Sequence, residues 1–297
     1  MKNHLSFLVV GKTQESKEST GFKRYVGLAA SHVLAFNPKK SELDALMGFE
    51  SANEPEYLVD TDNGKEVRLT FIVRTDPDSN NGIEITNRLV FTLRNKIAYS
   101  SDQSKIQVLD NYGNAVWIPA EDAKAGKALE PNMKAVGKYH IACDGEAALT
   151  DFLRTYLGVP YVLTYTNGAW GVNDRAKDGE FILEHLKDYF KGDFSEIKEA
   201  LAMQPNNKIK LLYGVRTTDD NKQYQVICSR AGFFLRNNAG SKAIAKLEKD
   251  LADAKNAGAF ANIEYKVQEL QEYTVQPTNL SEIPAQSEDT SSELPWD

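Results

Sequence analysis

Cysteine is scarce in this chain, and the two cysteines that occur, Cys143 and Cys228, lie far apart in sequence. Two distant cysteines supply neither a disulfide framework nor a thiolate zinc site. Long apolar runs are also lacking, because no stretch approaches the roughly 18 apolar residues that span a bilayer. The N-terminus lacks the length of a signal h-region and a small-residue cleavage site. We therefore expect a soluble protein of the reducing cytoplasm.

The motifs of common enzyme classes are absent as well. The sequence has no P-loop, no paired-glycine dinucleotide fingerprint, no HExxH and no GxSxG. His140 and Cys143 are three residues apart, but no second pair completes a tetrahedral metal site, so we interpret them as structural. We expect no enzyme activity and no cofactor. Because acidic residues are plentiful, a nucleic-acid enzyme that uses dispersed carboxylates and magnesium stays open as an alternative.

Alternating apolar and polar residues are the main structural signal. The 297 residues are 41% hydrophobic, which is enough for a sizeable core. Residues 66–75 and 83–94 alternate with period two on either side of a turn-forming DPDSNNG, which predicts a long hairpin with arginines along its outer face. Residues 208–216 and 223–230, joined by a polar TTDDNK segment, predict a second hairpin of the same kind.

Helical spacing is less frequent than strand spacing. Apolar residues at intervals of three and four predict short helices over residues 41–47, 146–157, 180–191, 194–203 and 241–256. The order of elements predicts an α+β protein built on a β-barrel or strongly curved antiparallel sheet with helical insertions. We expect a core over residues 1–275, with insertions around 111–205 that include a surface excursion at 111–138. Residues 276–297 form an acidic tail too poor in apolar residues to fold, so we expect it to be disordered.

The charge is distributed unevenly. The formal net charge is -7, and residues 277–297 contain five acids and no base. Between residues 205 and 246, eight basic residues face two acidic ones, a balance of +6. This asymmetry allows an acidic protein to carry a basic surface for an anionic partner.

Several of the basic residues are interleaved with aromatic ones. Single-stranded nucleic acid is held by this combination, because cations follow the phosphates and exposed rings stack on bases at about 1–3 kcal/mol each. Any single arginine on the outer face of a strand is more often simply solvated. The candidate nucleic-acid-binding residues are Lys23, Arg24, Tyr25, Arg68, Arg74, Arg88, Arg94, Lys96, Lys208, Lys210, Arg216, Tyr224, Arg230, Phe233 and Arg236. Phe233 and Phe234 are adjacent, so in an extended segment we expect one ring to face away from the core.

The last residues of the chain carry the most specific signal. Glu293 is followed by Leu294, Pro295 and Trp296, a compact apolar element at the end of an acidic segment. An exposed terminal tryptophan invites association. We interpret these four residues as a peptide that docks into a basic-rimmed pocket on a partner protein.

This ending resembles the acidic tip of bacterial and phage single-stranded DNA-binding proteins, in which acids precede a Leu/Ile-Pro-aromatic terminus. It differs in having Trp296 where Phe is usual and in placing Asp297 after the aromatic residue. More loosely, residues 208–236 and the helix after them resemble the basic hairpin region of phage-encoded proteins of this class, whose setting is the host cytoplasm.

The resemblance implies an OB-fold core that binds single-stranded DNA without sequence specificity during DNA replication, recombination and repair. It further implies that the tail recruits replication and repair proteins. Homo-oligomers are left open. The principal alternative is a structural or scaffold protein of a virion or large assembly, which would show little salt-dependent affinity for oligonucleotides.

Overall fold

The structure is a computed structural model that describes residues 23–62, 64–123, 130–131, 139–158, 160–173 and 175–274. The strands of its main sheet are β1 (Tyr25–Phe36), β2 (Leu58–Thr61), β3 (Gly64–Thr75), β4 (Thr86–Ile97), β8 (Cys143–Asp144), β12 (Ile209–Thr217), β13 (Gln223–Ile227), β14 (Leu235–Arg236), β15 (Ile263–Tyr265) and β16 (Gln271–Glu272). Two smaller sheets consist of β5 (Lys105–Leu109), β6 (Ala115–Pro119) and β7 (His140–Ile141), and of β9 (Tyr161–Thr166), β10 (Ala169–Val172) and β11 (Phe181–Ile182). The helices are α2 (Lys40–Met47), α3 (Glu146–Leu157), α4 (Leu186–Tyr189), α5 (Ser195–Met203) and α6 (Ser241–Asn256), with a 3₁₀ turn η1 at Pro77–Ser79.

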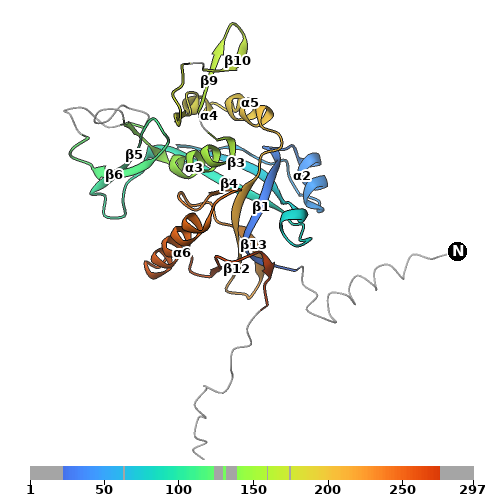
Figure 1. Ribbon diagram of the computed structural model, residues 1–297. Helices are drawn as coiled ribbons and strands as arrows, with labels where there is room; N and C mark the ends of the chain where they lie inside the picture. The colour runs from blue at the N-terminus through green and yellow to red at the C-terminus, as the bar shows by residue number, and fades with distance from the viewer. Residues whose placement is uncertain are drawn as a thin grey trace, which may run out of the picture.

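The main sheet is antiparallel and curved (Figure 1). Its strand order is β13-β12-β1-β3-β4-β8, and β13 approaches β4 although three strands separate them in this order. The described strands do not close into a hydrogen-bonded barrel. The predicted α+β class and both predicted hairpins are confirmed, because β3 pairs with β4 from Glu66↔Arg94 to Arg74↔Thr86 and β12 pairs with β13.

The described residues between β4 and β12 contain strands that the sequence did not predict. Residues 111–138 were expected to be a surface excursion; within them β6 is mostly exposed and pairs with β5 in a hairpin that the sequence did not predict. Residues 180–191 were expected to be one helix, but they divide into β11 and the four-residue α4, because Phe181 and Ile182 pair in parallel with β9. The predicted helices corresponding to α3 and α6 are confirmed.

An aromatic core fills the concave side of the sheet. Phe152 of α3 lies 4.9 Å from Phe71, 5.2 Å from Phe91 and 5.5 Å from Phe234, measured between ring centroids. All four rings are buried, and the buried face of β12 joins the same cluster. These contacts hold α3 inside the curve of the sheet.

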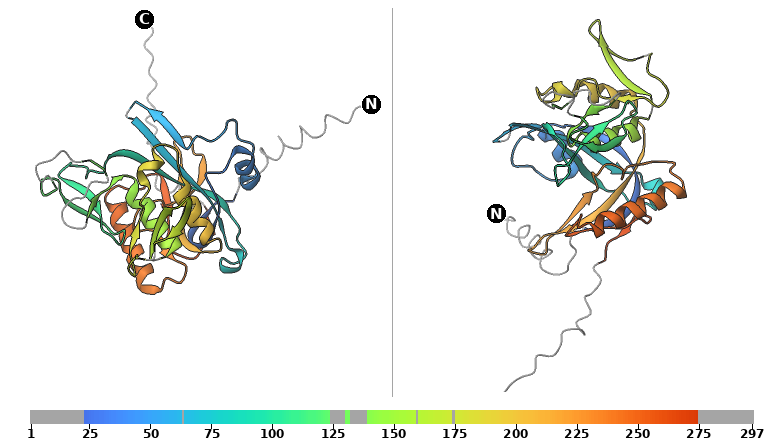
Figure 2. Two further views of the ribbon diagram at one scale, coloured as in Figure 1. Left: turned by 90° about the horizontal axis from the view of Figure 1, so that it is seen from above. Right: turned by 90° about the vertical axis from the view of Figure 1, so that its left-hand side faces the viewer.

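A second core lies on the opposite face of β12. Leu212 of β12 and Leu247 and Leu251 of α6 form its centre, with α6 lying along the strands (Figure 2). Phe234 faces the first core, whereas Phe233 faces the second and is only 3% exposed. The expectation that one of these adjacent rings points away from the core was wrong, because the sheet has a core on each face.

No helix in the described part of the chain is long and apolar enough to cross a membrane. The tail at 276–297 lies outside the described residues.

Gly145 is required where the chain enters α3. Its φ is +90°, and a Cβ added there would lie 2.0 Å from the backbone oxygen of Thr92 in β4. We expect Gly145→Ala to lower the free energy of unfolding by about 3 kcal/mol or more, through backbone strain and displacement of α3 from β4. The change is measured by urea denaturation.

Gly258 provides the matched control, because its φ is +80° and no atom of the described residues lies within 4 Å of an added Cβ. Gly258→Ala should lower the free energy of unfolding by about 1–2 kcal/mol, the strain of the left-handed conformation alone. Equal losses for the two variants would contradict the close approach of Gly145 to β4.

Candidate nucleic-acid interface

The outer face of β3 and β4 brings together five of the predicted basic residues. The register places Arg68 opposite Thr92 and Arg74 opposite Thr86, with the remaining cations along β4. Alternation along the two strands gives these side chains a common face, as the sequence predicted. The five are Arg68, Arg74, Arg88, Arg94 and Lys96.

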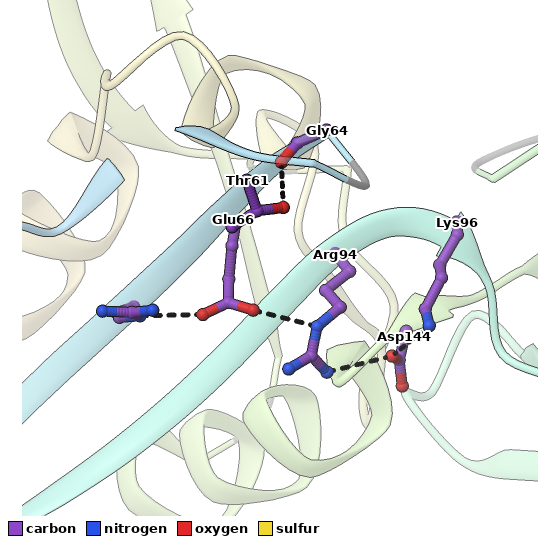
Figure 3. Close-up of polar contacts among 7 residues, drawn as sticks. Thr61, Gly64, Glu66, Arg94, Lys96 and Asp144 are labelled. Carbon is purple, nitrogen blue, oxygen red and sulfur yellow. Dashed lines mark hydrogen bonds and ion pairs between the residues drawn. The ribbon is translucent and has the colours of Figure 1, made fainter. Parts of the chain in front are cut away.

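Carboxylates neutralise most of that face. Glu66 Oε1 accepts a hydrogen bond from Arg68 Nε at 2.7 Å, and Glu66 Oε2 accepts one from Arg94 Nε at 2.9 Å. Asp144 of β8 pairs with Arg94 at 3.3 Å and with Lys96 at 3.6 Å (Figure 3). The hydrogen bond from Arg68 and the charge of Arg94 hold the pKa of Glu66 below its usual range.

The other two cations of this face are also engaged. Arg74 lies 3.6 Å from Glu84, and the guanidinium of Arg88 lies 5.8 Å from the ring centroid of Phe49. A phosphate backbone would have to displace these contacts before it gained any attraction. The β3–β4 face is therefore a poorer phosphate-binding surface than its composition predicts.

A second group of predicted residues meets at the start of β1 and the β12–β13 hairpin. Arg24 donates to the backbone oxygen of Gln223 at 3.1 and 3.2 Å, and the side chain of Gln225 hydrogen-bonds the backbone of Tyr25. Across the hairpin, the guanidinium of Arg216 lies 5.7 Å from the ring centroid of Tyr224. The structure thus joins two distant segments of the sequence. Lys23, however, is paired with Glu272 at 2.7 Å.

The third group surrounds a hollowed region at β14. A hollow of about 600 Å³ lies between α3 and α6, one of about 580 Å³ lies at the C-terminal end of α3, and a third of about 580 Å³ lies beside β1 and the start of α6. The first two share Arg236 and Asn238, and the last two share Asn237. We call these three adjoining hollows the β14 groove.

The β14 groove is predominantly cationic and amide-rich. Among the described residues, two carboxylates line it, Asp151 and Glu269. The five cations that line it are Arg154, Lys208, Lys210, Arg236 and Lys246. The asparagines that line it are Asn80, Asn81, Asn114, Asn206, Asn207, Asn237 and Asn238.

The cations of the β14 groove differ in availability. Among the residues that the structure describes, neither Arg236 nor Lys210 forms an ion pair. Lys208 is paired with Asp76 at 2.6 Å, and this hydrogen bond holds the pKa of Asp76 below its usual range. Arg236 is exposed at the point where two of the hollows meet, which makes it the best placed cation of the groove.

The sequence did not identify the α3 side of the groove. Asp151 is 8% exposed and accepts hydrogen bonds from Arg154 Nη2 at 2.9 Å and from the backbone nitrogen of Gly232 at 2.6 Å. Burial raises the pKa of Asp151 against the opposing effect of these bonds. Arg154 also donates to the backbone oxygen of Tyr112, a residue that is 39% exposed and lines the first hollow. No sequence pattern connects these three segments.

The prediction that Phe233 stacks on a base is wrong. Phe233 is buried, so its ring cannot contact a base, and the guanidinium of Arg230 lies 5.8 Å from its ring centroid.

His140 and Cys143 both contact Glu146. His140 Nε2 lies 2.9 Å from Glu146 Oε1, and the backbone nitrogen of Cys143 donates to Glu146 Oε2 at 2.8 Å. Within the described ranges, no group of three or more His, Cys, Asp or Glu residues could hold a metal ion. The predicted partner-binding residues Glu293, Leu294, Pro295 and Trp296 lie outside the described residues.

Comparisons with protein families, with curated proteins and with solved structures found no match to this chain.

The double pairing of Glu66 generates a prediction about stability. Because its folded pKa is depressed, Glu66 contributes stability above its ordinary pKa of 4.5, and this contribution is lost as pH falls through the folded pKa. The arginine partners are partly exposed, so we expect Glu66→Gln to cost only about 1 kcal/mol at pH 7. The cost should disappear toward about pH 3, as measured by urea denaturation at both pH values.

Glu84→Gln is the control, since Glu84 is exposed and makes one long ion pair. It should change the free energy of unfolding by less than about 0.5 kcal/mol at either pH. A pH-independent loss in Glu66→Gln would show that its ion pairs do not stabilise the fold.

Proposed function

We propose that this chain binds single-stranded DNA in the β14 groove, without sequence specificity and without catalysing a reaction on it. The observation that carries the proposal is that three hollows adjoin in one groove, where Arg236 lines two of them, Lys210 lines the third, and neither cation forms an ion pair within the described structure. Cations with no internal carboxylate partner can neutralise phosphates without first breaking a contact.

The amide groups of the groove support an unspecific mode of binding. Asparagine side chains donate and accept hydrogen bonds, so they can meet phosphates, sugars or base edges. Asn237 and Asn238 directly follow Arg236, and both line the groove. A strand held by cations and amides along its backbone needs no particular base sequence.

The course of the groove favours a single strand over a duplex. In the register of β12 and β14, Arg236 lies opposite Ile209, whose side chain faces the first core. Lys210 lies opposite Leu235, whose side chain faces the second core. A strand in contact with both cations must therefore pass from one face of the sheet to the other. Duplex DNA is stiff over about 150 base pairs, so it cannot follow such a path within one domain, whereas a single strand can.

The wider features of the proposal rest on the sequence resemblance. The curved sheet, in which β13 approaches β4, is compatible with an OB-like core enlarged by insertions. In this proposal the chain acts in the cytoplasm during DNA replication, recombination and repair, in a host cell if it is phage-encoded. Its acidic end, Glu293 to Trp296, recruits partner proteins.

The proposal is tested with Arg236→Ala and fluorescence anisotropy of a labelled oligo-dT. We expect the intact chain to bind with an affinity that salt weakens, and Arg236→Ala to bind about tenfold more weakly, a loss of about 1.4 kcal/mol. The slope of log affinity against log salt should become shallower by about 0.7, the value for one lost phosphate contact on a single strand. The oligonucleotide should stay intact in magnesium.

Lys249→Ala is the matched control, because Lys249 is an exposed cation of α6 that does not line the groove. It removes the same charge and should change the affinity by less than twofold, which corresponds to a change in binding free energy of about 0.4 kcal/mol or less. If the two variants lose affinity equally, binding is a diffuse charge effect and the groove is not the site. Absence of binding by the intact chain at low salt would remove the proposed function itself.

A further inference from the structure

The β9–β10 hairpin projects from the body of the protein (Figures 1 and 2). It turns at Asn167 and Gly168, which have φ values of +56° and +80° as a tight hairpin turn requires. Trp170, two residues after the turn, is partly buried against the first core, and its ring lies 4.6 Å from that of His185. This contact anchors the hairpin to the body of the protein.

One face of this hairpin is apolar, and part of it is uncovered. The register pairs Trp170 with Tyr165 and Val172 with Leu163, so these four side chains share a face. Leu163 is fully buried in the first core, but Tyr165 is 57% exposed and Val172 is 58% exposed. Trp170 is partly buried against the same core, so Tyr165 and Val172 are the uncovered part of this face among the described residues.

The outer edge of β10 is an open strand edge. Among the described strands β10 pairs only with β9, on one side. The backbone nitrogen of Asn173 donates to the oxygen of Val162, so by alternation the backbone groups of Trp170 and Val172 point away from β9. These groups form a row of donors and acceptors that another strand can satisfy.

The edge of β10 has one feature that limits strand pairing, its length of four residues, and lacks the others. Natural edge strands are protected by shortness, charged residues, proline or bulges. From Tyr161 to Asn173 the sequence contains no charged residue and no proline, and β10 pairs with β9 in unbroken register. A chain with a net charge of -7 meets its own copy with least repulsion at an uncharged surface. Single-stranded DNA is a poorer occupant, because its phosphates require cations that the hairpin does not have.

We propose that the open edge of β10 pairs antiparallel with β10 of a second copy of this chain. The pairing is symmetric, because a two-fold axis brings identical strands together antiparallel. It joins two three-stranded sheets into one, and it brings the exposed Val172 of each copy against the apolar face of the other. It is independent of nucleic-acid binding, since none of these residues lines the β14 groove.

The test is sedimentation equilibrium of the full chain without DNA, up to about 100 µM protein, where a micromolar dimer is populated. We expect a concentration-dependent mass that approaches twice the 33.1 kDa of one chain. Val172→Lys places two like charges in the interface and should raise the dissociation constant at least tenfold. Thermal melting checks that the variant is folded.

Two controls place the same charge elsewhere. Thr166→Lys alters an exposed position of β9 away from the open edge, and Val116→Lys alters the exposed, uncharged edge of the other hairpin, β5–β6. Both should keep the dissociation constant of the intact chain. A chain that stays at one monomer mass at all concentrations would overturn the proposal. A dimer that persists in Val172→Lys, or one that is lost in Val116→Lys, would overturn it as well. If the chain is a monomer and Val172→Lys lowers its affinity for oligo-dT, the hairpin binds nucleic acid and the proposal is wrong.

Discussion

The packing of Phe152 against Phe234 is the contact on which the arrangement of this molecule depends. It holds α3 in the concave side of the sheet, and it fixes the segment that becomes β14 at the next residue, Leu235. The hydrogen bond from the backbone nitrogen of Gly232 to Asp151 joins the same two segments at 2.6 Å. Arg154 on α3 and Arg236 on β14 consequently lie on either side of one hollow. The positions of the groove residues are therefore fixed by core packing and not by contacts between flexible surface side chains.

Internal carboxylates determine which cations are available to a ligand. Burying or pairing a charge has a large effect on what it can bind, because a partner must first be displaced. Glu66 and Asp144 occupy three of the cations on the β3–β4 face, although that face has the most regular basic pattern in the sequence. The β14 groove has the same number of cations, five, yet two of them, Arg236 and Lys210, have no such partner in the described structure. Availability, and not the number of cations, therefore distinguishes the two surfaces.

Period-two alternation was sufficient to predict β3, β4, β12 and β13, because each of these strands buries one face. The alternation is visible whether or not another element covers the opposite face. It could not show that α6 covers the opposite face of β12, and this second core is why Phe233 is buried. It also could not show that Glu66 lies between Arg68 and Arg94, since the pairing depends on cross-strand register. Lys208, Lys210 and Arg236 of the groove were found from sequence through local charge density. Arg154 and Tyr112 were missed because three-dimensional packing alone brings them to β14. Asn237 and Asn238 could have been recognised as groove residues from their position between Arg236 and the start of a helix.

The central claim is that the β14 groove holds the single strand. Hydrogen exchange of the full chain, followed by mass spectrometry with and without saturating oligo-dT, tests it without any substitution. The account predicts slower exchange of backbone amides in residues 206–210 and 232–243, with little change along β3 and β4. Protection along β3 and β4 without protection of residues 232–243 would contradict the account, as would saturated binding that protects neither region.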